Sequence, residues 1–300
     1  MLPITTPFKP DETLDLDALG SNIRQWNETG IAGYVMMGST GERVHLDERE
    51  YAEVVMRARA EVPGHLRFIV GAGQQSTRGT INDIIRVSEN LSIAAVLVIT
   101  PSFYCTSITQ SSLIDFYSAV ANESPVPVIL YSMPALTGIR IEPETAAQLS
   151  QHHNIIGMKD SSADVEGLKQ TVCLVEDDFA VLTGNGTVLD QALQAGASGA
   201  ILAVGCVAPR LCIEITEAIK SGDVSRAEKL QAALTPLAAA VTSRFGQGGL
   251  KTALDMIGYS GGVVRSPLKM PDAKARKDIS QCLQEAENAL QHPAGMSRSN

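Results

Sequence analysis

The sequence has no excess of basic residues and no long apolar stretch. Its 300 residues carry 24 Lys and Arg against 33 Asp and Glu, a formal net charge of −9. Nucleic acid and anionic membranes both bind basic faces, so we expect neither as a partner. The longest apolar stretches, such as residues 94–99, are far shorter than the roughly 18–20 residues that cross a bilayer. No basic segment followed by an apolar one opens the chain, which predicts a cytoplasmic protein, or one of the mitochondrial matrix if a transit peptide has been removed.

Cysteine is scarce and unpaired in the sequence. The five cysteines never form a C-x-x-C pair, and the five histidines do not lie at metal-ligand spacing from them. We therefore expect neither a structural zinc site nor a disulfide framework. An apolar fraction of 44% with 19% charged residues allows a sizeable core and excludes a disordered chain.

Short apolar runs recur along the chain and alternate with helical patterns. Runs that are apolar on both faces are typical of parallel strands. Eight such strands alternating with helices predict an α/β fold, a (β/α)8 TIM barrel; a doubly wound sheet with one extra strand would give a similar pattern. The runs are residues 3–6, 33–38, 68–73, 94–101, 126–134, 155–160, 180–184 and 199–204.

After the last run the sequence predicts helices only. The last barrel helix is expected at residues 209–221, and further helices at 225–240, 248–257 and 272–290. We therefore predict a barrel at residues 1–222 and a C-terminal helical appendage at residues 223–300 that packs on it. Its end, residues 292–300, is polar and is expected to be frayed.

Two polar residues end neighbouring runs, where a barrel places its active site. Lys159 shares a strand face with Gly157, which we expect to leave room for the lysine stem. If that face points into the barrel, burial disfavours the ammonium form, and the amine can form a Schiff base with a carbonyl. Tyr131 lies 28 residues earlier, one βα unit away, where its phenol could relay protons. The alternatives are a solvated lysine beyond the strand end and a tyrosine that only packs at the barrel rim.

A glycine-flanked pair of hydroxyl residues, Gly38-Ser39-Thr40-Gly41-Glu42, follows the second run. In such a segment backbone N–H groups can converge on a carboxylate and form an anion-binding nest. The segment is not a P-loop, because the glycine spacing and the following lysine are absent. An ordinary turn at a helix start is the alternative.

Three motifs together resemble the signatures of the dihydrodipicolinate synthase / N-acetylneuraminate lyase family. They are residues 38–42, residues 131–138 (Tyr-Ser-Met-Pro-Ala-Leu-Thr-Gly) and residues 157–160 (Gly-Met-Lys-Asp). Their order, their placement at strand ends and the 28-residue interval match, and the resemblance covers nearly the whole chain. The stretch from Arg244 to Leu268 indicates the 4-hydroxy-2-oxoglutarate aldolase branch.

The resemblance implies class I, metal-free chemistry on pyruvate-type 2-oxo acids, with no cofactor beyond a covalent lysine imine. It implies that Ser39 and Thr40 hold the carboxylate of the 2-oxo acid. It also implies a homotetramer, a dimer of dimers, in which the loop after the fourth strand reaches the partner's active site. The implied catalytic residues are Lys159, Tyr131, Ser39 and Tyr104, and the implied substrate-binding residues are Thr40, Gly38, Ile201 and Gly184.

Two positions depart from the family pattern. Leu136 stands where the synthase branch has an arginine that clamps the carboxylate of the aldehyde substrate. A leucine cannot make this bidentate contact, and Arg140, four residues further on, is the nearest substitute. Phe103 stands where the relay tyrosine is expected, with Tyr104 beside it. Either Tyr104 takes that place or the relay is truncated.

We therefore predict a carbon–carbon lyase that cleaves 4-hydroxy-2-oxoglutarate to pyruvate and glyoxylate. Lys159 attacks the C2 carbonyl, the imine acts as the electron sink for C3–C4 cleavage, and Tyr131 takes the C4 hydroxyl proton. The alternatives in the same class are 4-hydroxy-tetrahydrodipicolinate synthase, which Leu136 disfavours, and a sugar-acid aldolase or dehydratase. The alternative from another class is a weakly catalytic homologue that binds 2-oxo acids, which Phe103 motivates.

Overall fold

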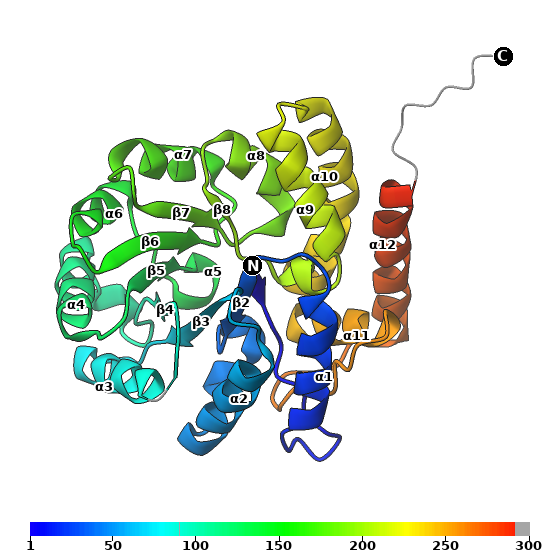
Figure 1. Cartoon of the computed structure of the whole chain (residues 1–300), viewed down its shortest axis with the longest axis horizontal. Helices are drawn as coiled ribbons and strands as arrows, with labels where there is room; N and C mark the ends of the chain where they lie inside the picture. Colours follow the sequence, from blue (N-terminus) through cyan, green and yellow to red (C-terminus); the bar gives the residue numbers. More distant parts are fainter. Residues whose placement is uncertain (90, 292–300) are drawn as a thin grey trace.

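Eight parallel strands pair in chain order in the computed structural model, which describes residues 1–89 and 91–291 (Figure 1). The backbone closes the ring between its ends: the Met1 nitrogen donates to the Ala200 carbonyl oxygen at 2.9 Å, and the Leu202 N–H donates to the Met1 carbonyl oxygen at 3.2 Å. The predicted TIM barrel is confirmed. The strands are β1 Leu2–Pro3, β2 Gly33–Met36, β3 Arg67–Ala72, β4 Ala95–Ile99, β5 Val128–Ser132, β6 Ile155–Asp160, β7 Ala180–Thr183 and β8 Gly199–Ala200.

Helices follow the strands and cover the outside of the barrel (Figure 1). The helices around the barrel are α1 Leu16–Asn27, α2 Glu48–Glu61, α3 Thr77–Ser88, α4 Gln110–Glu123, α6 Pro143–Ser150, α7 Val165–Leu174, α8 Leu189–Gln194 and α9 Pro209–Lys220. Shorter turns of helix are α5 Pro134–Thr137, η1 Ser39–Gly41, η2 Arg43–His45, η3 Cys105–Ser107, η4 Gly186–Val188 and η5 Ala203–Cys206. After α9 come α10 Val224–Ala239, the π-helical η6 Ala240–Arg244, α11 Gly246–Met256 and α12 Ala273–Gln291.

Residues at the starts of α2 and α6 satisfy or avoid the N–H groups that a helix leaves unpaired at its first turn. At the start of α2, Asp47 accepts the N–H of Glu50 at 2.8 Å, and the Glu50 carboxylate accepts the N–H of Asp47 at 3.2 Å. This capping box satisfies two N–H groups that the helix itself leaves unpaired. Pro143 occupies the first turn of α6, where a missing N–H costs nothing.

The first and last strands are shorter than the sequence predicted. The expected runs at residues 3–6 and 199–204 reduce to two paired residues each, in β1 and β8. Pro3 and Pro7 have no N–H to donate to a ladder, and residues 203–206 turn into η5 instead of extending. The barrel therefore depends on six longer central strands and two short ones that close it.

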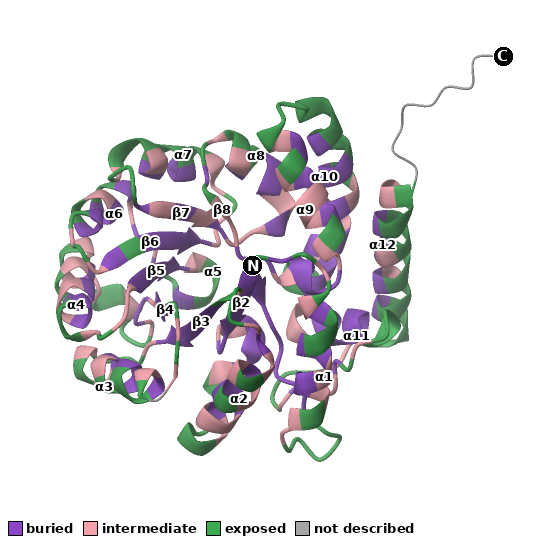
Figure 2. Ribbon diagram, in the orientation of Figure 1, coloured by how far each residue is buried: buried purple, intermediate pink, exposed green. Residues whose placement is uncertain are grey.

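Burial divides the strand residues between two packed layers. Residues that face the helices form one large cluster, and those that face the axis form a smaller one, as expected for strands buried on both faces. Figure 2 shows the ribbons of β5 and β6 largely in purple, the colour of buried residues. The interior cluster consists of Val35, Ile69, Ala95, Leu97, Ile129, Tyr131 and Ile201. Tyr131 thus faces into the barrel.

The C-terminal helices stand beside the part of the barrel formed by α1, α8 and α9 (Figure 1). Helix α10 packs on α9, and α12 packs on α10 and α11. The boundary at residue 222 stays a prediction, and the expected frayed end at residues 292–300 lies outside the described residues. Within the described part of the chain, no helix is long and apolar enough to cross a membrane.

Trp26 joins α1 to both η5 and the segment after α11. Its side chain is fully buried, its Nε1 donates to the Cys206 carbonyl oxygen at 2.9 Å, and its ring stacks on Tyr259 with 5.0 Å between the centroids. The indole therefore supplies both apolar contact and the hydrogen bond that a buried carbonyl requires.

We expect Trp26→Phe to lower the free energy of unfolding by about 1–3 kcal/mol, because the Cys206 carbonyl oxygen is left unpaired while the aromatic stacking remains. The matched control is Tyr259→Phe, which keeps the stacked ring and should change the free energy of unfolding by no more than about 0.5 kcal/mol. Because Trp26 is the only tryptophan, unfolding in urea should be followed by circular dichroism. Equal losses in the two variants would contradict this role of the indole.

Candidate active site

Lys159 lies inside the barrel near the C-terminal end of β6. Its side chain is 5% exposed, and in the strand register it pairs with Tyr131 of β5 on one side and Leu182 of β7 on the other. The Nζ atom stands 4.3 Å from the centroid of the Tyr131 ring. The structure thus places the lysine and the tyrosine side by side at the barrel end where TIM-barrel chemistry occurs.

The room for the lysine stem comes from Gly184 and not from Gly157. A Cβ at Gly184 would lie 2.6 Å from the Cε of Lys159 and would also clash with the Oγ of Ser161. A Cβ at Gly157 would instead meet the Ala180 carbonyl oxygen at 2.5 Å, so this glycine serves the close pairing of β6 with β7. Our expectation for Gly157 was wrong, because the space beside a strand residue is set by the neighbouring strand.

Tyr131 connects the lysine to the loop after β2. Its side chain is 3% exposed, and its hydroxyl lies 3.1 Å from the Oγ of Ser39. Burial by itself raises the pKa of the Tyr131 phenol. The charge of Lys159 and side-chain hydrogen bonds with Ser39 and Ser161 outweigh burial, so the pKa of Tyr131 lies below its ordinary value. The phenol is therefore suited to exchange protons with a group beside it.

The nest segment forms a single turn of 3₁₀ helix, η1, directly after β2. Two non-glycine residues in the left-handed region flank it, Met37 with φ 56° and Glu42 with φ 54°. Backbone in this region is strained for residues with a Cβ and persists only where the surroundings enforce it. The turn is thus held in place by its neighbours.

Two residues outside the predicted set hold this turn. Gly71 of β3 lies so close to it that a Cβ would clash with the Met37 carbonyl oxygen and approach the Gly38 nitrogen to 2.9 Å. Thr6 donates its hydroxyl to the Gly41 carbonyl oxygen at 2.7 Å. The sequence offered a signal for Gly71, a glycine inside an apolar run, and none for the Thr6 contact.

The remaining barrel-lining candidates take positions around the same strand ends. Ile201 is fully buried, belongs to the interior cluster with Tyr131, and donates its N–H to the Thr183 carbonyl oxygen at 2.9 Å. Thr40 is 6% exposed within η1. Ser161 lies against Gly184, on the same side as the Lys159 stem. No pattern in the sequence predicted Ser161, although it follows Lys159 by two residues.

The aromatic pair after β4 stands apart from the buried residues. Phe103 and Tyr104 are 76% and 69% exposed, and their rings meet edge to face at 5.0 Å. The side-chain oxygen of Gln75 accepts the N–H groups of Ser102 and Phe103, both at 2.8 Å, which fixes the loop. A single chain therefore presents Tyr104 to solvent, while Ser39 and Tyr131 pair inside.

Leu136, at the position where the resemblance predicts an arginine, is also exposed. Leu136 is 61% exposed on the short helix α5. Arg140 is engaged elsewhere: its Nη1 lies 2.7 Å from the carboxylate of Asp164, at the start of α7, and its Nε lies 3.8 Å from that of Glu142. In this arrangement Arg140 is neutralised by two acids.

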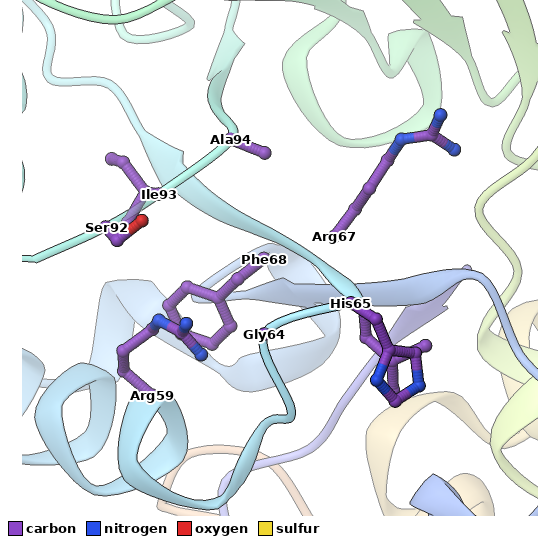
Figure 3. A pocket seen from close by; sticks show the side chains of 9 residues that line it. Arg59, Gly64, His65, Arg67, Phe68, Ser92, Ile93 and Ala94 are labelled. Carbon is purple, nitrogen blue, oxygen red and sulfur yellow. The ribbon is translucent and has the colours of Figure 1, made fainter.

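A hollow of about 200 Å³ lies at the other end of the barrel, where β3 and β4 begin (Figure 3). The Arg59 guanidinium covers the Phe68 ring at 5.4 Å from its centroid, while Arg67 points the other way (Figure 3). The two cations do not converge, so we do not assign this hollow to the chemistry. In residues 1–89 and 91–291, no group of three or more His, Cys, Asp or Glu side chains could hold a metal ion.

Barrel and appendage together are similar to one known family. A profile of the Dihydrodipicolinate synthetase family matches residues 1–286. The chain belongs to this family. The 4-hydroxy-tetrahydrodipicolinate synthase of Methanopyrus kandleri is 33% identical over 282 residues, which cover 93% of this chain and 92% of that protein.

Solved structures of the family share the fold described above. The dihydrodipicolinate synthase of Thermotoga maritima has a TM-score of 0.88 at 30% identity, covering 95% of this chain and 97% of that one. The chloride-inhibited enzyme of Acinetobacter baumannii, solved with pyruvate, has a TM-score of 0.88 at 26% identity and the same coverage. The protein is therefore an enzyme, a carbon–carbon lyase, as the sequence predicted. These relatives are synthases, and the 4-hydroxy-2-oxoglutarate aldolase branch stays a prediction.

We expect Ser39→Ala to raise the pKa of Tyr131, because the variant loses the side-chain contact that favours the tyrosinate. Ultraviolet titration of tyrosinate absorbance measures this, with Tyr131→Phe identifying the component that belongs to Tyr131. The control is Ser243→Ala, an exposed hydroxyl on η6, which should leave the curve unchanged. A Ser39→Ala curve that superimposes on that of the unmodified protein would contradict the contact.

Proposed function

We propose that this lyase binds pyruvate as a Schiff base on Lys159. The observation that carries the proposal is the enclosed lysine whose Nζ lies 4.3 Å from the Tyr131 ring, with the Tyr131 hydroxyl 3.1 Å from Ser39. The relative solved with pyruvate supports this choice of 2-oxo acid.

Imine formation requires a proton acceptor beside the lysine and later a proton donor. Tyr131 has a lowered pKa because of the neighbouring charge of Lys159 and the Ser39 and Ser161 hydroxyls, which outweigh burial. We propose that it takes a proton from the Lys159 ammonium and that the amine then adds to C2. Tyr131 returns this proton to the C2 oxygen, which with a second proton from the nitrogen leaves as water, and the protonated imine remains. The imine itself is the electron sink, so the proposed mechanism uses neither a metal nor an organic cofactor.

In this proposal the nest segment binds the carboxylate of the 2-oxo acid. Gly38, Ser39 and Thr40 supply backbone N–H groups and two hydroxyls, the donor set that an anion requires. Gly184 keeps the lysine side open, and Ile201 supplies an apolar wall beside Tyr131.

For the second substrate, the relatives favour synthase chemistry over the cleavage of 4-hydroxy-2-oxoglutarate that the sequence predicted. In the synthase reaction the enamine of pyruvate adds to aspartate semialdehyde, and M. kandleri and T. maritima have proteins named for that activity. The aldolase remains a second candidate because of one observation. The exposed Leu136 offers no guanidinium for a second carboxylate, and Arg140 is paired with Asp164.

We propose that the active enzyme is a homotetramer, a dimer of dimers, in which Tyr104 reaches the site of the partner subunit. The support is the exposure of the Phe103–Tyr104 pair at the end of the barrel that carries Lys159. Aromatic residues are enriched in the buried centres of interfaces. In such an assembly Tyr104 extends the proton path from Ser39 and Tyr131.

Borohydride reduction in the presence of pyruvate should place about +72 Da, a reduced pyruvyl group, on Lys159. Gly184→Ala should lower labelling ~100-fold, because the new Cβ displaces the Cε of Lys159. The matched control is Gly64→Ala, whose Cβ meets nothing within 4 Å. Peptide mass spectrometry identifies which lysine carries the label. A label on the buried Lys251, or no label, would refute the proposal.

Leu136→Arg should raise kcat/KM for the condensation of pyruvate with aspartate semialdehyde by ~10-fold or more, because a guanidinium adds a charge-assisted bidentate pair worth about 1.5–3 kcal/mol per hydrogen bond. Leu136→Lys is the control, since it adds the charge without the fork geometry and should gain less. Both rates, condensation and 4-hydroxy-2-oxoglutarate cleavage, should be measured on the unmodified chain as well. If the unmodified protein condenses pyruvate with aspartate semialdehyde faster than it cleaves 4-hydroxy-2-oxoglutarate, it is a synthase. If cleavage is the faster reaction, it is an aldolase.

A further inference from the structure

Glu42, the last residue of the nest segment (residues 38–42), forms a fully buried ion pair with Lys251. The Glu42 side chain is 1% exposed and that of Lys251, on α11, is 0% exposed, and Oε1 and Nζ lie 2.6 Å apart. Burial lowers the pKa of Lys251, and the Glu42 carboxylate opposes this shift. The mechanism proposed above uses neither group.

Every side of the pair is occupied by the protein itself. The Oε2 of Glu42 accepts a hydrogen bond from the backbone N–H of Arg265 at 3.1 Å and lies 3.2 Å from the Nδ1 of His45. The Nζ of Lys251 donates to the Val263 carbonyl oxygen at 2.6 Å and stands 4.3 Å from the centroid of the Phe8 ring. The pair therefore has no open face for a ligand, and any role in the reaction must act through other residues.

The α11–α12 connector, residues 257–272, joins this pair to the barrel. Val263 donates its N–H to the Phe8 carbonyl oxygen at 3.1 Å. The Arg265 guanidinium binds the Glu50 carboxylate, with one contact at 2.6 Å, and the His45 carbonyl oxygen at 2.7 Å. Position 261 admits only glycine, since a Cβ there would clash with the Lys251 carbonyl oxygen. Charges from α2, α11 and the connector thus converge on the loop after β2.

Backbone hydrogen bonds connect Glu42 to the other residues of the nest segment. Its N–H donates to the Ser39 carbonyl oxygen at 3.2 Å, and its own φ of 54° reverses the chain at the end of η1. Its carbonyl oxygen accepts the His45 N–H at 2.8 Å. Ser39 in turn lies 3.1 Å from the Tyr131 hydroxyl. Gly41 alone separates Glu42 from Thr40, and Thr40 follows Ser39 directly, so the buried ion pair lies next to both hydroxyl residues of the proposed carboxylate site.

We propose that Glu42 and Lys251 are positioning residues that hold Ser39 and Thr40 in the geometry that binds the 2-oxo acid. The inference rests on the proposed function of the nest. A buried ion pair adds little net stability over a well-packed apolar pair, because desolvation offsets the attraction. The geometric role explains why two charges stand where apolar residues would serve stability equally well.

The test compares a variant without both charges, Glu42→Gln/Lys251→Met, with Asn22→Ala. The double variant avoids the unpaired buried carboxylate that Lys251→Met alone would leave. Asn22 exchanges two hydrogen bonds with Ser260 of the same connector, at 2.8 and 2.9 Å, away from the nest. Circular dichroism in urea shows that each variant is folded, and Lys251→Met alone should unfold at a lower urea concentration than the double variant.

Two readouts report on the nest. The first is the pyruvate concentration that gives half-maximal borohydride labelling of Lys159, which we expect to rise ~10-fold or more in the double variant. The second is the tyrosinate titration of Tyr131, whose midpoint should move upward as in Ser39→Ala. Asn22→Ala should change neither.

Unchanged values of both readouts in the folded double variant, or equal shifts in Asn22→Ala, would overturn the positioning role. If pyruvate fails to label Lys159 in the unmodified chain, the proposed function fails instead. In that case the tyrosinate titration alone decides whether Glu42 and Lys251 position Ser39.

Discussion

The pairing of β5 with β6 beyond a register shift at Val128/Ile129 is the constraint on which the site depends. It sets Tyr131 directly opposite Lys159, and the next pairing sets Lys159 opposite Leu182. Because side chains alternate between the two faces of a strand, a shift of either strand by one residue would turn its own group toward the helices and separate Tyr131 from Lys159. The long ladders of β3 to β6 fix this register, while the short β1 and β8 only complete the ring.

Two glycines without room for a side chain shape the candidate site. Gly184 leaves the volume that the Lys159 stem fills, and Gly71 lets β3 approach the strained backbone at Met37. A side chain at either place would push on a strand or on a catalytic candidate. A glycine at such a position lowers the free energy of unfolding, because glycine loses more conformational freedom on folding than other residues.

The sequence predicted the barrel and the two strand-end residues because their signals are local. Apolar runs reveal strands, and the spacing from Tyr131 to Lys159 equals one βα unit, which the strand order confirms. The contribution of Gly157 was mistaken and that of Gly71 was missed, because each depends on the backbone of a neighbouring strand. The pairing of Glu42 with Lys251 joins positions more than 200 residues apart, and no periodicity in the chain encodes it.

The proposed sites for the two substrates lie on different parts of the molecule. The groups proposed to bind pyruvate stand on strands and on a turn whose Glu42 takes part in a buried ion pair and donates its N–H to the Ser39 carbonyl oxygen. The residues proposed to lie near a second substrate, Leu136 and the Phe103–Tyr104 pair, are exposed on a short helix and a loop. Loops tolerate substitution far better than packed strands. In the proposed mechanism, a substitution at an exposed position such as Leu136 can change the aldehyde that is accepted while Lys159 and Tyr131 stay in place.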